Sequence, residues 1–201
     1  MVTGSELHGH PAPNGQRDLT LRNRQRIRPL NLAMLRRIVR ALLHEAWPEG
    51  HFDLAIYVVA APEMTRINET FLQHQGSTDV ITFDYAERVG QASRLSRSRA
   101  ANTRARDRRD ACPTLLHGQI FICVDEAVRQ ARRFRTTWQS ELVRYAVHGV
   151  LHLLRYDDRT PKARVRMKAA EDGLVRRLAR QFAFRSLSRP LRAEHRPHRT
   201  A

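Results

Sequence analysis

Two histidines stand four residues apart in the apolar segment HGVLHLLRYDD, at His148 and His152. On a helix, side chains four residues apart are neighbours about 5–6 Å apart, so both imidazoles can bind one ion. A catalytic metal needs a third protein ligand and an open position for water. Asp158 follows His148 by ten residues, which is the place of the third ligand in the protease motif H-E-x-x-H-x-x-G-x-x-H. We therefore predict metal binding by His148, His152 and Asp158. Asp157 is the alternative third ligand.

The chemistry of this site differs from that of the protease. Gly149 stands where the protease motif has the glutamate that acts as general base. Without a base on this helix, the metal itself has to acidify the attacking water. A carboxylate in place of a third imidazole makes the ion a weaker acid toward its water, and it suits Fe(II) as well as zinc. The alternative is a histidine pair that packs beside the core and binds no metal.

The chain is strongly basic. Its 201 residues are enough for one domain and too few to expect two, and its formal net charge is +16. Such a charge favours a polyanionic partner, most simply nucleic acid, but does not separate RNA from DNA or from an acidic membrane. Cys112 and Cys123 form no paired motif, so neither a disulfide framework nor a cysteine zinc site is indicated. The chain has no apolar run of ~20 residues and no apolar signal core, so we expect a cytoplasmic protein.

The hydrophobic pattern predicts both strands and helices. Strands are predicted at 18–25, 53–59, 80–85 and 118–124, the second of them central with both faces covered. Helices are predicted from Asn31 to Ala46, through Met64 to Leu72 with an end at Gly76, from the cap Asp125 to Phe134, from Thr136 or Thr137 to His152, and from the cap Thr160 and Pro161 through Val165, Leu174, Leu178 and Phe182. The histidine helix has little polar face apart from the ligands, so it should be buried and central.

These elements predict a single α+β domain. We expect a mixed sheet of about four strands packed with about five helices, and a metal site at the end of the buried central helix. Residues 1–17 should form a disordered tail, 18–184 the metallohydrolase domain, and 185–201 a basic C-terminal tail. An insertion rich in arginine, at about 86–116, has few apolar residues and should be disordered. It is either a solvated loop or an arm that contacts RNA.

The motifs resemble those of a known family. HGVLHLLRYDD, with Met167 nine residues later, resembles the signature H-G-x-L-H-L-x-G-Y-D-H followed by methionine in the YbeY endoribonucleases, metal-dependent proteins of bacterial ribosomal RNA maturation. Asn68, TDVITF at 78–83 and HGQIFI at 117–122 resemble the family's Asn, its T-D-V-L-S-F block and its G-D-I-x-I strand. The resemblance covers roughly 18–184, less the insertion.

The chain departs from the family pattern at four places. Asp158 replaces the third histidine, Arg155 the glycine of the G-Y-D turn, and Gln119 the aspartate of the strand. Leu72 stands where the family has a basic residue after the second helix. If the turn needs a left-handed residue at position 155, arginine there costs on the order of 1–2 kcal/mol.

The resemblance implies a zinc ion held by His148, His152 and Asp158, with a water that attacks a phosphodiester of single-stranded RNA. Other divalent transition metals are alternatives. The implied function is a single-strand-specific endoribonuclease that acts in 3′-end maturation of 16S ribosomal RNA and in ribosome quality control, with the small ribosomal subunit as partner and no membrane. The alternative is a catalytically impaired RNA-binding factor that keeps the fold. The oligomeric state is not indicated.

Further residues close to the ligands in sequence, or in the matching motifs, are candidates for supporting roles. Arg155 and Lys162 are candidates for binding the RNA backbone, with solvated cations as the alternative. Asp157 should fix the turn or a ligand histidine, and Met167 should pack beneath the site. Asp79, with Thr78, either supports the same cleft or forms an ordinary turn. Whether His117 faces the cleft is undecided.

Overall fold

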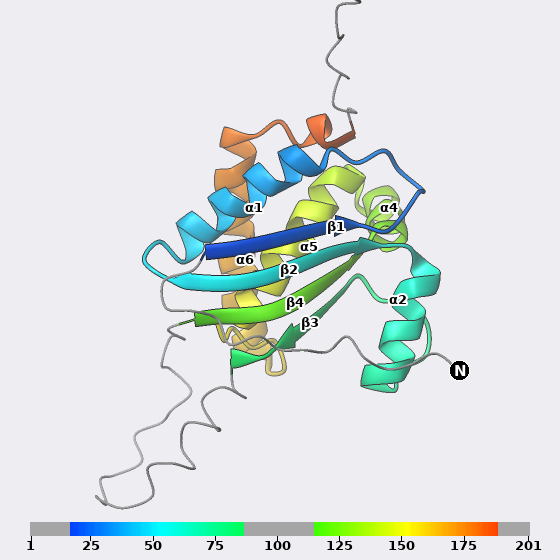
Figure 1. The fold of residues 1–201 in the computed structure, drawn as a ribbon, viewed down its shortest axis with the longest axis horizontal. Coiled ribbons are helices and arrows are strands. Elements are labelled where there is room, and N and C mark those ends of the chain that lie inside the picture. Colours follow the sequence, from blue (N-terminus) through cyan, green and yellow to red (C-terminus); the bar gives the residue numbers. More distant parts are fainter. Residues whose placement is uncertain (1–16, 87–114, 189–201) are drawn as a thin grey trace, which may run out of the picture.

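The computed structural model describes residues 17–86 and 115–188 (Figure 1). The predictions for the N-terminal tail, for most of the arginine-rich insertion and for the end of the C-terminal tail lie outside the described residues. At the edges of these segments, Arg17 begins a strand, Leu115 begins another, and Phe184–Ser188 form a short 3-10 helix, η3.

The sheet has four strands in the order β1-β2-β4-β3. They are β1 (Arg17–Asn23), β2 (His51–Val59), β3 (Val80–Asp84) and β4 (Leu115–Cys123). β1 and β4 both run parallel to β2, whereas β3 pairs antiparallel with β4 at the sheet edge. The mixed four-stranded sheet is therefore confirmed. β3 and β4, which precede and follow the insertion in the sequence, are neighbours in the sheet.

The helices pack mainly on one face of this sheet (Figure 1). They are α1 (Leu32–Ala46), α4 (Val124–Phe134), α5 (Trp138–Leu153) and α6 (Pro161–Gln181). Helix α2 (Ala61–Ile67) and the π-helical turn η1 (Asn68–Leu72) contact the opposite face, where Met64 packs with Ile81 and Phe121. None of the helices in the described part of the chain has the length and apolar character that crossing a bilayer requires.

Helix α5 is the buried centre of the domain, as predicted. Leu142, Val147, Val150 and Leu151 are at most 1% exposed, because α5 lies between the sheet and the other helices. Gly149 permits this close packing. A Cβ atom at position 149 would stand 2.7 Å from Cγ2 of Ile120 on β4, closer than carbon atoms approach each other. No glutamate fits there, so the general base of the protease motif is sterically excluded.

Two details of the sequence prediction were wrong. Asp125 does not cap α4. Cys123 is the N-cap residue, and the Asp125 carboxylate instead accepts a hydrogen bond of 2.6 Å from the N–H of Ala61 at the start of α2. β2 is covered fully on one face only, since Asp53, Ala55 and Tyr57 on the other face are half-buried.

Candidate metal centre

The two histidines face each other at the carboxyl end of α5. Nε2 of His148 lies 3.0 Å from Nε2 of His152. A zinc ion bound at about 2.0–2.1 Å by two nitrogens in tetrahedral geometry holds them roughly 3.3 Å apart, so the observed pair is close to the spacing of two ligands of one ion. Burial and the neighbouring His148 lower the pKa of His152, outweighing the opposite effect of Asp158. A neutral imidazole is the form that binds metal, so this environment favours a ligand.

The turn after α5 brings the third ligand back toward the histidines. The N–H of Tyr156 donates to the carbonyl of Leu151, and the N–H of Arg155 donates to the carbonyl of His152, both at 3.0 Å. These two bonds form a Schellman motif, which requires a left-handed residue just after the helix. That residue is Arg155, with φ of 67°. The turn therefore does place a left-handed residue at position 155, and the cost of about 1–2 kcal/mol that the sequence analysis gave for arginine there applies.

Asp158 completes the cluster. Its Oδ2 lies 4.0 Å from Nε2 of His152, and one ligand atom from each of His148, His152 and Asp158 lies within 4.8 Å of the other two. Two imidazoles and a carboxylate form a donor set that suits zinc or Fe(II). The backbone carbonyl of Asp158 accepts from Nε of Arg164, so the first turns of α6 help to hold the loop. The three residues therefore fit a divalent transition metal.

Glu171 stands behind the first histidine and was missed by the sequence analysis. Its Oε2 lies 3.0 Å from Nδ1 of His148, the ring nitrogen that points away from the cluster. Burial by itself raises the pKa of Glu171, but hydrogen bonds from His148 and from two cations outweigh it and bring that pKa down to about 2. The ionised carboxylate can only accept, so it favours the tautomer in which Nδ1–H of His148 donates to it and Nε2 is directed at the metal position.

Two cations hold Glu171 in place. Nη1 of Arg144 donates to Oε1 at 2.6 Å, and Nζ of Lys168 donates to the same oxygen at 2.9 Å. Asp172 shares both cations, at 2.6 and 3.2 Å. The only sequence signal for this support is that Glu171 and Asp172 are the sole acidic residues of the basic helix α6. Nothing in that pattern indicates which histidine they reach.

The candidate residues next to the ligands in sequence make different contacts in the structure. The Asp157 carboxylate accepts from the backbone N–H of Arg159 at 3.1 Å and from its Nε at 2.9 Å, so Asp157 fixes the turn and is not in the ligand cluster. Arg155 reaches away from the cluster to β3, where Nη1 lies 3.0 Å from Oδ2 of Asp84. Its guanidinium is therefore already engaged by an acid and is a weaker candidate for RNA than an unpaired cation. Lys162 is exposed on the first turn of α6.

The remaining candidates, Met167, Asp79 and His117, make contacts outside the ligand cluster. Met167 is 2% exposed and belongs to the main core, in agreement with a packing role. Asp79 accepts from the Thr78 hydroxyl and from the N–H of Val80, at the opposite end of β3 from Asp84. It forms a local turn there. His117 pairs with Asp53 at 3.6 Å on the other face of the sheet from α5.

This arrangement defines a class of protein. A buried helix of a single α+β domain presents two histidines, the following turn adds an aspartate, and a second carboxylate lies behind the first imidazole ring. This is the framework of a metal-dependent hydrolase. Comparison with known protein families agrees with this class. The family model described as "Endoribonuclease YbeY" matches residues 20–179. The chain belongs to the YbeY family.

Individual relatives support the same assignment. A protein of Chlorobium phaeovibrioides described as "Endoribonuclease YbeY" is 34% identical over 149 residues, which cover 74% of this chain and 83% of that protein. A relative with the same description from Chlorobium luteolum is 33% identical over 155 residues, covering 76% and 93%. The solution structure of TM1509 from Thermotoga maritima superposes with a TM-score of 0.52 at 19% identity, covering 89% of this chain and all of that one. That structure supports the fold alone.

Proposed function

We propose that this protein is a metal-dependent endoribonuclease that cleaves single-stranded RNA, and that it acts in the cytoplasm on the 3′ end of 16S ribosomal RNA in the small subunit and in ribosome quality control. The observation that carries the proposal is the facing pair of Nε2 atoms at 3.0 Å, with Asp158 beside them and Glu171 behind them. The family to which the chain belongs supplies the substrate class.

The residues of the site have separate tasks in this proposal. A divalent metal such as zinc would be held by His148, His152 and Asp158, where it would supply Lewis acidity toward a bound water and toward the phosphate. Glu171 holds the His148 ring in one orientation and one tautomer. Asp157 and the Schellman turn hold Asp158 near the histidines. No side chain from position 149 provides a base, because the backbone there packs on the sheet.

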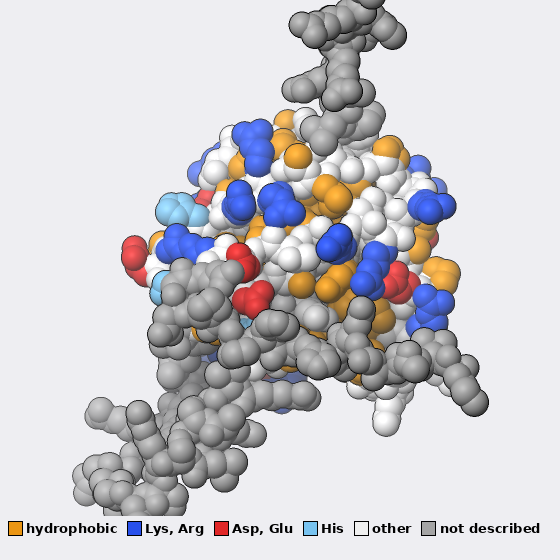
Figure 2. All heavy atoms as spheres, in the orientation of Figure 1, with side chains coloured by type: hydrophobic (Ala, Val, Ile, Leu, Met, Phe, Trp, Pro, Cys, Tyr) orange, Lys and Arg blue, Asp and Glu red, His pale blue; other side chains and the backbone are white. Residues whose placement is uncertain are grey.

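The surface charge suits a polyanionic substrate. Figure 2 shows Lys and Arg side chains spread over the face that presents the sheet, with fewer acidic ones among them. The chain as a whole carries a formal charge of +16. Neutralising RNA phosphates releases their counterions, so binding should weaken steeply as salt increases.

A second candidate function is an RNA-binding factor with impaired hydrolysis. Two observations favour it: a carboxylate replaces the third imidazole that the family signature has, and the Arg155 guanidinium is held by Asp84. Such a factor would bind ribosomal RNA with the same salt dependence but would not cleave it.

Cleavage of a single-stranded RNA by purified, untagged protein tests the choice. We expect His152→Ala to abolish cleavage and to leave RNA affinity unchanged, since His152 acts through the metal. His44→Ala, which removes an exposed histidine of α1, is the matched control and should cleave like the wild type. Cleavage that persists in His152→Ala contradicts the nuclease proposal. Binding without cleavage in the metal-loaded wild type assigns the second function.

A further inference from the structure

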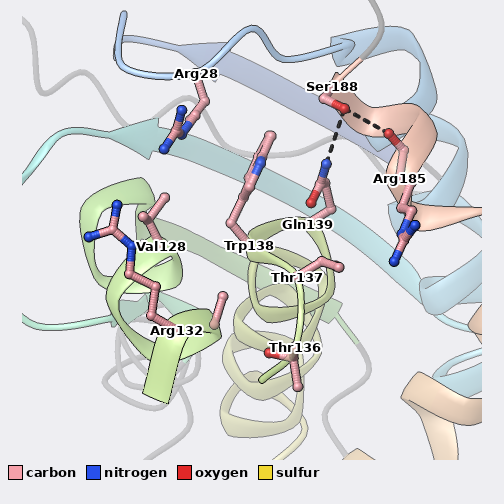
Figure 3. A pocket seen from close by; sticks show the side chains of 10 residues that line it. Arg28, Val128, Arg132, Thr136, Thr137, Trp138, Gln139, Arg185 and Ser188 are labelled. Atoms are coloured by element: carbon pink, nitrogen blue, oxygen red, sulfur yellow. Dashed lines mark hydrogen bonds between the residues drawn. The ribbon is translucent and has the colours of Figure 1, made fainter. Parts of the chain in front are cut away.

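A basic pocket lies at the opposite end of α5 from the metal centre. A pocket of about 460 Å³ opens there, between the segment before α1, helix α4, the first turn of α5 and η3 (Figure 3). Its walls include three arginines from three different parts of the chain: Arg28, Arg132 and Arg185. In Figure 3 the guanidinium groups of Arg28 and Arg132 point toward the same space, and Arg185 stands across the pocket.

These three charges are not balanced locally. Within residues 17–86 and 115–188, none of the three side chains has an acidic partner, and no acidic residue lines the pocket. Other arginines of the domain are paired: Arg24 with Glu63 and Arg177 with Glu45, for example. Like charges gathered around one cavity repel one another, and an anion inside the cavity reverses that cost. The pocket therefore favours anionic ligands.

The uncharged side chains of the pocket indicate what kind of anion fits. Trp138, the first residue of α5, lines the wall next to the arginines and is only partly buried. An accessible indole offers a face on which an unpaired base can stack, and a guanidinium matches two oxygens of one phosphate. Gln139 is fixed by its Nε2, which donates to the Ser188 hydroxyl at 3.1 Å, so the floor of the pocket is held in place.

We propose that this pocket binds the phosphodiester backbone of single-stranded RNA, as an anchor remote from the metal centre. The choice of RNA rests on the proposed function. Charge complementarity and the neighbouring indole are what the structure contributes. Trp138 precedes His148 by 10 residues and His152 by 14, so at 1.5 Å per residue the pocket and the two histidines are separated by about 15–21 Å along α5. An RNA strand that is bound both in the pocket and at the metal centre would have a segment of fixed length between the two sites.

The test compares two triple variants with the same net charge. Arg28→Ala/Arg132→Ala/Arg185→Ala removes the pocket cations. Arg40→Ala/Arg176→Ala/Arg180→Ala removes three exposed arginines of α1 and α6 that have no acidic partner among the described residues. Both are made in the full chain with His152→Ala, which prevents cleavage, and circular dichroism melting confirms that each is folded. Affinity for a labelled single-stranded RNA is measured over a range of salt concentrations.

The expected difference follows from counterion release. Each phosphate contact on a single strand contributes about 0.7 to the slope of log affinity against log salt, so three lost contacts lower the slope by about 2. At 0.1 M salt this corresponds to a loss of about 100-fold, taking 1 M as the reference. The control triple should keep most of the wild-type slope. Equal losses in the two triples would show that only overall charge matters and would overturn the proposal.

A second readout reports on the pocket directly. The chain has two tryptophans, so Trp47→Phe leaves Trp138 as the only indole. Saturating single-stranded RNA should quench its emission, and unchanged emission would overturn the proposal. A failure of the proposed nuclease is distinguishable from these results: protein that binds RNA through the pocket but never cleaves refutes the nuclease alone. Protein that cleaves while both triples bind alike refutes the pocket alone.

Discussion

Glu171 should control metal affinity without touching the metal. The perturbation is Glu171→Gln, which keeps an oxygen able to accept from Nδ1 of His148 but removes the negative charge. Glu171→Ala removes the acceptor as well. At neutral pH the wild-type carboxylate is ionised, since its pKa is about 2. Both changes therefore weaken the bond that orients the His148 ring, and alanine abolishes it.

The magnitude follows from what Glu171 contacts. Replacing a carboxylate that supports a ligand histidine typically costs 10–100-fold in metal affinity, or about 1.4–2.7 kcal/mol. Glu171 is 6% exposed, so in the wild type its bond to His148 is shielded from competing water. Arg144 and Lys168 keep Asp172 as a partner at 2.6 and 3.2 Å, so the cations are not left unpaired. We expect about tenfold for glutamine and about 100-fold for alanine.

Zinc affinity is measured by competition with a chromogenic chelator at neutral pH. The matched control is Asp172→Asn, which removes an equal charge from a carboxylate that shares both cations but has no bond to His148. It should change zinc affinity little. Long-range proton–nitrogen NMR of the metal-free protein should show the His148 proton on Nδ1 in the wild type and a mixture of tautomers in Glu171→Ala.

Two results would refute this reasoning. If Asp172→Asn weakens zinc binding as much as Glu171→Gln, the effect is a general change of charge and not ring orientation. If Glu171→Ala binds zinc like the wild type, the hydrogen bond to His148 has no role in the site.

Three further predictions concern the third ligand, the turn and the buried cysteine. Asp158→Ala should lose the equivalent of bound metal that elemental analysis finds in the wild type; retention would exclude Asp158 as a ligand. Arg155→Gly should be more stable to urea than Arg155→Ala by about 1 kcal/mol, because both lose the ion pair with Asp84 while only glycine adopts φ of 67° without strain; equal stability would contradict a left-handed turn. Burial raises the pKa of the Cys123 thiol from 9.0 to about 11, so in Cys112→Ser protein the thiol should react with disulfide reagents only on unfolding. Because this folded pKa lies above the unfolded one, the stability it contributes is complete below about pH 9 and falls by about 2 kcal/mol as the pH rises to 11, which urea titrations across that range would detect.

Much of the metal site could be predicted because the residues that form it are close together in the sequence. His148 and His152 are four residues apart, and helical geometry alone places them on one face. The burial of α5 followed from its apolar residues, and Thr137 and Thr160 each cap the next helix through a side-chain oxygen, as the sequence indicated. The left-handed turn at Arg155 lies within the same ten residues as the ligands. Each of these features depends on neighbours in the chain.

The features that were missed all join distant segments. Glu171 reaches His148 across 23 residues, and only the angle at which α6 packs on α5 decides that it does. Asp125 is of a residue type that often caps helices, yet it accepts from the N–H of Ala61, 64 residues earlier, because the first turns of α2 and α4 lie side by side.

The sequence by itself therefore determined the helix that carries the histidines, the identity of three ligand candidates and the basic character of the chain. These could be predicted because hydrophobic periodicity and residue spacing depend only on a single helix or turn. Only the tertiary structure decided which carboxylate stands behind His148, that Arg155 is held by Asp84, and that Arg28, Arg132 and Arg185 surround one pocket. Those contacts depend on how packed elements cross, and packing is a property of the whole core rather than of any one segment.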